Sequence, residues 1–292
     1  MTDLPKIGFA GLGLMGGPMA ARLQAAGFPL IVWNRSLEKA APFLAAGAAL
    51  AGAPSELCAA DFVFLNLLDR KAIEAVIFGP GGVAEGKGGA TVLADFSTIP
   101  PDATREIAAR LKAANGIDWV DAPVSGGAVG AKDGTLAIMA GGPAEAVDRL
   151  RPVMAHLSAR FTHMGGTGAG QATKLVNQII SGCTMAVVAE AVAFAEKTGV
   201  DPALLTEALG GGFADSRPFQ IFVPRMAASL YEPPLGATDT MIKDLAEVER
   251  TAAETGARLP LVSAALGEMR ASSGRGDGGK DISAIVEMWR AG

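Results

Sequence analysis

The sequence predicts an α/β fold in which a doubly wound parallel sheet precedes an all-α domain. Three observations lead to this prediction. Short, fully apolar segments alternate with helix-like stretches through the first half of the 292-residue chain. Such apolar runs are typical of parallel strands, because these are buried on both faces of the sheet. A glycine-rich break at residues 165–170 then interrupts the pattern, and strand-like segments largely stop after it.

The elements before the break follow one another in alternation. Gly27 is a good stop for the first helix, and Pro100 and Pro101 suit the first turn of a later one. The expected strands are residues 7–10, 30–33, 62–67, 91–95, 117–120 and 137–140. The expected helices are one that runs to residue 26 and those at residues 37–46, 71–76, 102–114 and 144–156.

The chain after the break reads as helices only. The first of these, residues 171–198, has about twice the usual globular length and ends at Gly199. The others are expected at residues 202–209, 217–228, 241–255, 261–271 and 282–289. We therefore expect two domains, residues 1–165 and residues 166–292, with the long helix at the start of the second.

Composition excludes several classes of protein. The formal net charge of −5 argues against a general surface for nucleic acid or for an anionic membrane. Cys58 and Cys183 are far apart and lack CxxC spacing, so we expect neither a disulfide framework nor a bound metal. The N-terminus lacks the pattern of a signal peptide, and the apolar stretch at residues 179–194 is interrupted by Glu190. We expect a soluble, cytoplasmic protein without a membrane span.

A glycine-rich turn follows the first expected strand directly. Gly11 permits a tight turn, Gly13 lets a pyrophosphate approach the backbone, and Gly16 lets the next helix pack closely. That helix offers free N–H groups and partial positive charge to a phosphate. An ordinary turn is the alternative, but the strand before it and the helix and strand after it favour a Rossmann-type dinucleotide site. The expected cofactor-binding residues are Gly11, Leu12, Gly13, Leu14, Met15 and Gly16.

The end of the second expected strand indicates which dinucleotide fits. A site that prefers NAD usually has Asp or Glu here, which binds the ribose hydroxyls. This chain has Asn34, Arg35 and Ser36 instead. Arg35 can bind a phosphate bidentately, and Asn34 and Ser36 can donate to it. We therefore expect NADP(H) to be preferred and NAD(H) to be possible, unless Arg35 is only a solvated surface charge.

Polar side chains form a stripe on the long apolar helix. Lys174, Asn177, Gln178 and Ser181 are spaced by three, four and seven residues, which places them on one helical face. Unpaired polar groups in an apolar interior cost roughly 2–7 kcal/mol, so packing alone does not explain the stripe. Lys174 and Asn177 are therefore candidate catalytic residues. The alternative is a lysine that extends its ammonium to solvent from a helix end.

Three other places carry candidate site residues. The Ser125 hydroxyl and the backbone N–H groups of Gly126 and Gly127 could hold a small carboxylate, although a plain loop is the alternative. Residues 95–98 read Asp-Phe-Ser-Thr at the end of a strand and would lie near a nicotinamide. Lys243, on a later helix, could reach the same site or be a solvated helix charge.

Together these motifs resemble the β-hydroxyacid dehydrogenase family from end to end. The group includes 3-hydroxyisobutyrate dehydrogenase, tartronate semialdehyde reductase and the glyoxylate/succinic semialdehyde reductases. Residues 11–20 are similar to its cofactor motif, residues 121–136 to its highly specific substrate motif and residues 168–177 to its catalytic motif. Residues 243–245 and 281–284 match two further family patterns.

The resemblance implies the fold and chemistry of that family. Residues 1–165 would be the Rossmann domain, and residues 166–292 an all-α substrate and oligomerisation domain like that of 6-phosphogluconate dehydrogenase. The activity would be NADP(H)-dependent interconversion of a small β-hydroxy acid and its semialdehyde or keto acid, with Lys174 as general acid and base. Ser125, Gly126 and Gly127 would bind the substrate carboxylate. The other residues that the resemblance places in the site are Gln178 and Lys243 for substrate, and Leu67, Leu68, Thr98 and Lys243 for cofactor.

Three positions depart from the family pattern. The catalytic motif usually ends in two asparagines, and here the second is Gln178. Gly236 stands where the family usually has Phe, seven residues before Lys243. The usual Leu-Pro step is Leu67-Leu68 here. The first two departures alter the expected substrate pocket and the third the expected nicotinamide pose, but none removes an inferred catalytic group.

Two other functions share this architecture. Imine reductases usually carry an acid or a tyrosine in place of the lysine, and non-catalytic cofactor-binding modules lose it, so Lys174 argues against both. We expect the partners to be a small carboxylate-bearing aldehyde or hydroxy acid and further copies in a homodimer or homotetramer, because the long apolar helix needs cover. Glyoxylate, succinic semialdehyde, tartronate semialdehyde and 3-hydroxyisobutyrate all remain candidates.

Overall fold

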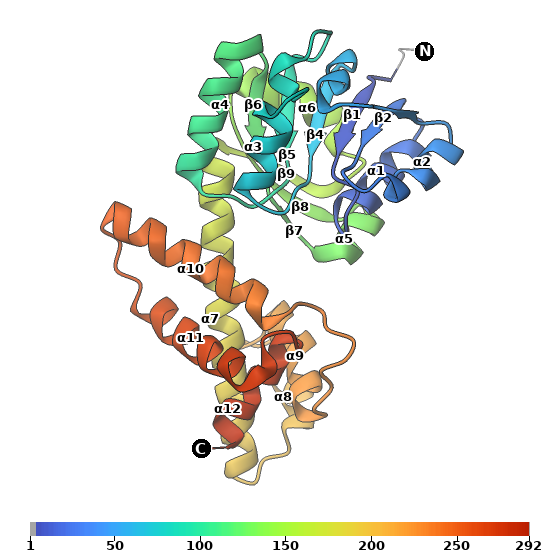
Figure 1. The fold of residues 1–292 in the computed structure, drawn as a ribbon. Coiled ribbons are helices and arrows are strands. Elements are labelled where there is room, and N and C mark those ends of the chain that lie inside the picture. The colour runs from blue at the N-terminus through green and yellow to red at the C-terminus, as the bar shows by residue number, and fades with distance from the viewer. Residues whose placement is uncertain (1–3, 292) are drawn as a thin grey trace. The chain divides into compact units, whose positions relative to one another are not determined.

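The computed structural model describes residues 4–291, and the chain divides into two compact units. The first unit extends to Lys174 and the second begins at Leu175, so this division falls inside the long helix α7 (Ala169–Lys197). All named strands belong to the first unit, and the described part of the second unit consists of helices and their connections (Figure 1). The predicted fold class is confirmed.

The first unit is built on a nine-stranded sheet. The strand order is β3-β2-β1-β4-β5-β6-β8-β7, and β9 also pairs with β8. Pairing is parallel from β3 to β6, as expected, whereas β8 runs antiparallel to β6 and β7. The strands are β1 (Ile7–Ala10), β2 (Leu30–Trp33), β3 (Ala49–Leu50), β4 (Phe62–Leu65), β5 (Val92–Asp95), β6 (Asp118–Asp121), β7 (Val124–Ser125), β8 (Leu136–Gly141) and β9 (Ser158–Gly165).

Helices cover both faces of this sheet because alternate strand residues face opposite sides. Phe9 and Phe64 pack with Met19 on one face, and Leu65 packs with Ile73 on the other. The helices of the first unit are α1 (Gly16–Ala25), α2 (Ala41–Ala45), α3 (Arg70–Phe78), α4 (Pro101–Asn115), α5 (Gly127–Asp133) and α6 (Ala144–Met154). The 3-10 turns are η1 (Leu37–Lys39), η2 (Pro54–Ala59) and η3 (Val83–Glu85).

Register places the ends of the central strands side by side. Leu65 of β4 pairs with Asp95 of β5, and Asp95 pairs with Asp121 of β6. Both aspartates are fully buried. In a doubly wound sheet, ligands bind outside the carboxyl ends of the strands. These two side chains therefore belong to the edge where a site is expected.

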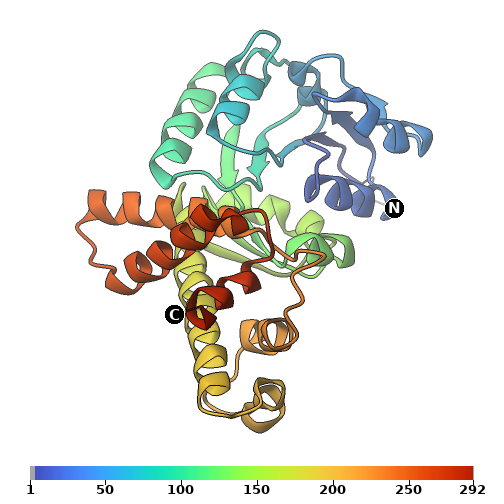
Figure 2. The ribbon, with the colours of Figure 1, turned by 60° about the horizontal axis from the view of Figure 1, so that its bottom comes forward.

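The second unit packs shorter helices around α7. Its core includes Met185, Val192, Leu245 and Leu266. Figure 2 shows the same elements from a second direction. The shorter helices are α8 (Leu205–Leu209), α9 (Arg217–Ala227), α10 (Thr238–Thr255), α11 (Pro260–Ser272) and α12 (Glu287–Arg290), with 3-10 turns η4 (Pro202–Leu204) and η6 (Ile282–Val286) and a π turn η5 (Ser273–Asp277).

Helix α7 is long and apolar enough, by length and composition, to cross a membrane. Its most apolar 18-residue window has a mean hydropathy of 1.6, and 50% of that window is buried within the structure. The buried part supplies Met185, Ala189 and Val192 to the core of the second unit. A core helix of a soluble protein has the same composition, and this packing explains the apolar character of the buried side of α7.

Candidate active site

The glycine-rich turn between β1 and α1 is closely packed at two of its glycines and open at the third. A Cβ on Gly11, whose φ is +97°, would lie 2.1 Å from the Asn66 carbonyl oxygen. A Cβ on Gly16 would lie 2.0 Å from the carbonyl oxygen of Gly11. Around Gly13, by contrast, a Cβ would meet no heavy atom within 4 Å. The protein's own backbone therefore requires the first and third glycines, while the second leaves open space where a phosphate could approach.

Two of the expected cofactor residues hold this turn in place. Leu12 donates its N–H to Asn34 Oδ1 at 2.8 Å, and Asn34 Nδ2 donates to the Ser36 carbonyl at 2.9 Å. The Leu12 side chain lies in the core, whereas Leu14 is 79% exposed. One N–H of Asn34 is thus engaged inside the protein. Asn34 ties the end of β2 to the glycine-rich turn.

Arg35 extends from the end of β2 as an exposed side chain. It forms no hydrogen bond or ion pair with any residue in the described range 4–291. Its guanidinium group therefore has all of its donors available. That property fits a group that binds an anion such as a phosphate.

The turn after β5 is organised by a buried carboxyl. Asp95 Oδ1 accepts the N–H of Ser97 at 3.0 Å, and Ser97 Oγ accepts the N–H of Leu67 at 2.9 Å. No hydrogen-bond partner of Asp95 Oδ2 occurs within the described residues. Burial and, to a smaller extent, the charge of Asp121 raise the pKa of Asp95 to about 7, against the opposing effect of its bonds with Ser97. Leu68 is 80% exposed beside this turn, and Thr98 is half-buried.

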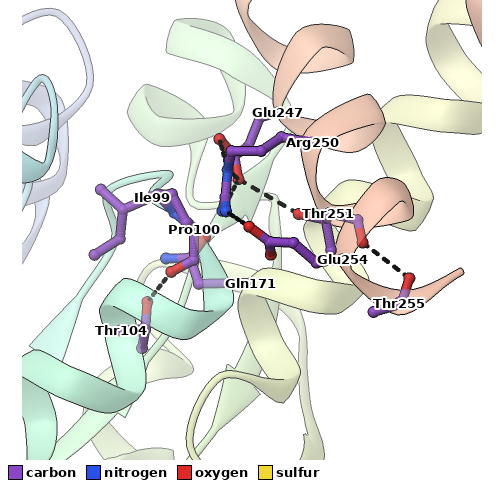
Figure 3. Close-up of polar contacts among 9 residues, drawn as sticks. All are labelled: Ile99, Pro100, Thr104, Gln171, Glu247, Arg250, Thr251, Glu254 and Thr255. Atoms are coloured by element: carbon purple, nitrogen blue, oxygen red, sulfur yellow. Dashed lines mark hydrogen bonds and ion pairs between the residues drawn. The ribbon is translucent and has the colours of Figure 1, made fainter.

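Asp121 and Gln171 fix the first turn of α7. Asp121 accepts the N–H of Gly168 at 2.7 Å and that of Gln171 at 2.9 Å, although burial raises its pKa overall. Gln171 Nε2 donates to the Ser97 carbonyl at 2.8 Å. Gln171 Oε1 accepts from the N–H of Ile99 at 3.4 Å, and Figure 3 draws these two residues. The start of α7 is therefore bonded to the ends of β5 and β6.

Lys174 lies one turn further along α7 and is half-buried. Its Nζ donates to the carbonyl oxygen of Val124 at 3.0 Å. Val124 directly precedes the Ser-Gly-Gly turn that was expected to hold a carboxylate. The structure thus brings the candidate catalytic lysine and this turn together.

The Ser-Gly-Gly turn leaves its polar groups available. Ser125 is half-buried at the end of β7, and its hydroxyl makes no hydrogen bond within residues 4–291. Gly126 and Gly127 have φ angles of +130° and +61°, which favour glycine. A Cβ on Gly127 would meet no heavy atom within 4 Å. The expected turn follows the two-residue strand β7 and leads into the short helix α5.

In the second unit, Gln178 connects Asn177 to helix α10. Asn177 Nδ2 donates to Gln178 Oε1 at 2.8 Å, and Gln178 Nε2 donates to Asp244 Oδ2 at 2.5 Å. Gln178 is only 6% exposed. Lys243, adjacent to Asp244 on α10, is exposed. Gly236 is open on its Cβ side, with no heavy atom within 4 Å of a Cβ built there.

The C-terminal motif at residues 281–284 has a structural role. Asp281 is fully buried, accepts the N–H of Leu235 at 2.5 Å and that of Ser283 at 3.0 Å, and pairs with Arg225 at 3.4 Å. These bonds hold the connection before α10 against the C-terminal segment. No group of three or more His, Cys, Asp or Glu side chains that could hold a metal was found in the part of the chain that the structure describes.

Sequence reasoning had assigned no role to Gln171. Its offsets of three residues from Lys174 and seven from Gln178 place it on the same helical stripe, and this signal could have identified it. Ser97 carried no such periodic signal. Its importance lies in its contacts with Leu67, Asp95 and Gln171, which only the fold reveals.

Comparison with known families agrees with this geometry. Residues 6–166 match the model for the NAD binding domain of 6-phosphogluconate dehydrogenase. Residues 168–289 match the model for the NAD-binding domain of NADP-dependent 3-hydroxyisobutyrate dehydrogenase. The two matches together span nearly the whole chain.

Individual relatives are similar over their full length. The chain is 36% identical to 3-hydroxyisobutyrate dehydrogenase of Pseudomonas aeruginosa, covering 99% of each chain, and 34% identical to 2-(hydroxymethyl)glutarate dehydrogenase of Eubacterium barkeri, covering 97% of this chain and 94% of the relative. Its structure matches 3-hydroxyisobutyrate dehydrogenase of Mycobacterium tuberculosis, solved with L-serine, with a TM-score of 0.88 at 31% identity, covering 98% of this chain and 99% of the other. The chain belongs to the β-hydroxyacid dehydrogenase family and is an NAD(P)-dependent oxidoreductase.

Proposed function

We propose that the protein interconverts a small β-hydroxy acid and its semialdehyde or keto acid with NADP(H), and that Lys174 transfers the proton. The observation that carries this proposal is the 3.0 Å bond from Lys174 Nζ to the Val124 carbonyl. That bond holds an ammonium group beside the turn formed by Ser125, Gly126 and Gly127. This contact supports a role of Lys174 as proton donor beside a turn that could hold a carboxylate.

Each group then has a distinct task. The Ser125 hydroxyl and the N–H groups of Gly126 and Gly127 bind the substrate carboxylate. Lys174 donates a proton to the carbonyl oxygen during reduction and removes the hydroxyl proton during oxidation. The nicotinamide, when bound along Gly11 to Gly16, supplies or accepts the hydride. We assign Asn177, Gln178 and Lys243 to the substrate side, and Leu67, Leu68, Thr98 and Lys243 to the cofactor side.

Steady-state kinetics over a substrate panel tests this function. The panel comprises glyoxylate, succinic semialdehyde, tartronate semialdehyde and 3-hydroxyisobutyrate, each with NADP(H) and NAD(H), and a cyclic imine with NADPH. We expect turnover with at least one of these acids. Tight NADPH binding without turnover of any of them would indicate a non-catalytic module, and turnover of cyclic imines alone would indicate an imine reductase.

Replacing Arg35 with Ala is expected to weaken NADPH selectively. A charge-assisted bond to the 2′-phosphate contributes about 1.5–3 kcal/mol, so KM for NADPH should rise roughly 10- to 100-fold while KM for NADH hardly changes. The measurement is KM for both cofactors at a saturating substrate concentration. Arg160→Ala, at an exposed arginine on β9, is the matched control. Equal effects on both cofactors, or a tenfold NAD preference of the unaltered protein, would contradict the assignment.

We also propose that the protein is a cytoplasmic homodimer or homotetramer. Four apolar side chains of α7 are largely exposed, and three of them recur at seven-residue intervals: Val176, Ile180, Val187 and Phe194. An exposed apolar stripe of this kind usually marks a protein–protein interface, here with another copy of the chain. Sedimentation velocity should give a mass at least twice that of the chain, and replacing Ile180 and Val187 with Glu should reduce it. A monomer at micromolar concentration would contradict the proposal.

A further inference from the structure

One buried side chain restrains the backbone on both sides of Thr98. Gln171 Nε2 donates to the Ser97 carbonyl oxygen at 2.8 Å, and Gln171 Oε1 accepts the N–H of Ile99 at 3.4 Å. The Ser97 carbonyl belongs to the peptide group before Thr98, and the Ile99 N–H belongs to the one after it. Because only two soft torsions lie between these peptide groups, the Gln171 amide limits both torsions of Thr98, as pairing with a neighbouring strand does.

The chemistry of this bridge requires a neutral amide. The Ser97 carbonyl needs a donor and the Ile99 N–H needs an acceptor, and a carboxamide presents both on one planar group. Gln171 is 1% exposed, so water does not compete for either bond. Residues 92–99 are buried with the exception of Thr98, which is half-buried and whose hydroxyl makes no hydrogen bond within the described part of the chain. Gln171 therefore holds in place a residue whose hydroxyl can bind another group.

Gln171 also belongs to the helical turn that carries Lys174. Both residues lie in the part of α7 that belongs to the first unit, and their spacing of three residues places them on one helical face. Asp121 Oδ2 accepts the N–H of Gln171 at 2.9 Å, and Lys174 Nζ donates to the Val124 carbonyl at 3.0 Å. The same turn of α7 is therefore bonded to the segment around Thr98 and to residues of β6 and β7.

We propose that Gln171 is a positioning residue that fixes Thr98 relative to Lys174, so that the bound nicotinamide and the proton donor are correctly placed for reaction with the same substrate carbonyl. This inference rests on the proposed function, which assigns Thr98 to the cofactor side and proton transfer to Lys174. Gln171 is buried, so it acts through these two residues and not by contact with the substrate. Its loss should affect kcat strongly, because a misplacement of about 1 Å can lower a rate about 10²-fold.

The first test compares kcat of Gln171→Met and Gln171→Glu with kcat of the unaltered protein over a range of pH. Methionine fills a similar volume but cannot bridge Ser97 and Ile99, so kcat should fall roughly 10- to 100-fold at every pH. A protonated glutamic acid has the shape of glutamine, and it can donate its O–H to Ser97 while its C=O accepts from Ile99. An ionised glutamate cannot donate. The kcat of Gln171→Glu should therefore be within about threefold of the unaltered protein near about pH 5.5 and at least about tenfold lower near about pH 8.

Thermal unfolding, which needs no substrate, reports whether the introduced carboxyl is ionised. Burial and the two aspartates near this position raise its pKa, and the two nearby cations oppose them. The charged groups on the surrounding elements are Asp95 on β5, Asp121 on β6, Arg105 on α4 and Lys174 on α7. Because the folded protein favours the neutral form, the thermal midpoint of Gln171→Glu relative to that of the unaltered protein should be highest below about pH 4 and should fall as pH rises through the raised pKa.

Gln24 provides the matched control in the same unit. Its Nε2 donates to the carbonyl oxygens of Phe43 and Ala46 at 3.0 Å each, and it is half-buried near the end of α1. Gln24→Glu should also lose stability as pH rises, but its kcat should stay within about twofold of the unaltered protein at every pH.

Two results would overturn the positioning role. One is that Gln171→Met keeps kcat within about twofold of the unaltered protein. The other is that the stability of Gln171→Glu changes with pH while its kcat relative to the unaltered protein does not. Absence of turnover by the unaltered protein would contradict the proposed function instead, so the two failures are distinguishable.

Discussion

Replacing Lys174 with methionine is expected to lower kcat by roughly 10²-fold or more while dinucleotide binding remains nearly intact. Methionine keeps a flexible apolar side chain of similar length, so packing along α7 is largely preserved. What disappears is the ammonium that donates to the Val124 carbonyl at 3.0 Å. The reacting oxygen then has no proton donor from this position. Measurements of kcat and of the dissociation constant for NADPH check the two parts separately.

Lys197 provides a matched control on the same helix. It lies in the last turn of α7 and is exposed, so Lys197→Met should leave kcat within about twofold. Lys174→Arg is informative as well, because a guanidinium keeps the charge but does not give up its proton near neutral pH. We expect this variant to be as slow as Lys174→Met. Full activity in any Lys174 variant would show that another group supplies the proton.

The central strands could be predicted because burial on both faces leaves an apolar run. Residues 7–10 and 30–33 are strands with the expected bounds. β9 was missed because it alternates between half-buried and exposed residues and contains Arg160 and His163. Its strand character comes from pairing with β8, which a single segment does not reveal. α5 was missed because its glycines oppose helix formation, and Gly130 is there for close packing against Leu136.

The candidate site was predictable only where its chemistry shows in local spacing. The periodicity of Lys174, Asn177 and Gln178 and the glycine turn at residues 11–16 are local patterns of this kind. The bond from Gln171 to Ser97 joins residues 74 positions apart. Neither periodicity nor composition encodes such a contact. The contacts that position the candidate site therefore depend on the fold, while the candidate reactive group, Lys174, is visible in the sequence.

Asp95→Asn is expected to make the stability of the protein less dependent on pH. In the folded protein, burial raises the pKa of Asp95 from 3.8 to about 7, so the native state disfavours the charged carboxylate. In the unfolded chain the Asp95 carboxyl is solvated, so it ionises near its ordinary pKa of 3.8. Ionisation therefore favours unfolding: the stability associated with the neutral carboxyl is complete below about pH 4 and is lost as pH rises through about 7. The difference of about three pKa units between the folded and the unfolded state corresponds to about 4 kcal/mol of unfolding free energy.

Asparagine remains neutral throughout this range and still accepts the Ser97 N–H. The free energy of unfolding of Asp95→Asn minus that of the unaltered protein should therefore increase by about 3 kcal/mol between about pH 5 and about pH 8. Urea denaturation at a series of pH values measures this difference. An overall loss of stability in the variant does not affect the test, because only the change of the difference with pH is used.

A surface aspartate distinguishes this effect from a general response to lost charge. Asp118 pairs with Lys112 at 2.8 Å and is partly exposed, so Asp118→Asn should give a difference in unfolding free energy that changes little over the same pH range. Asp95 differs because its carboxyl is fully buried and Oδ2 has no partner among the described residues. The buried carboxyl also organises Ser97, which bonds to both Leu67 and Gln171. If Asp95→Asn and the unaltered protein lose stability in parallel as pH rises, Asp95 is already ionised in the native state, and solvent or a cation must reach Oδ2.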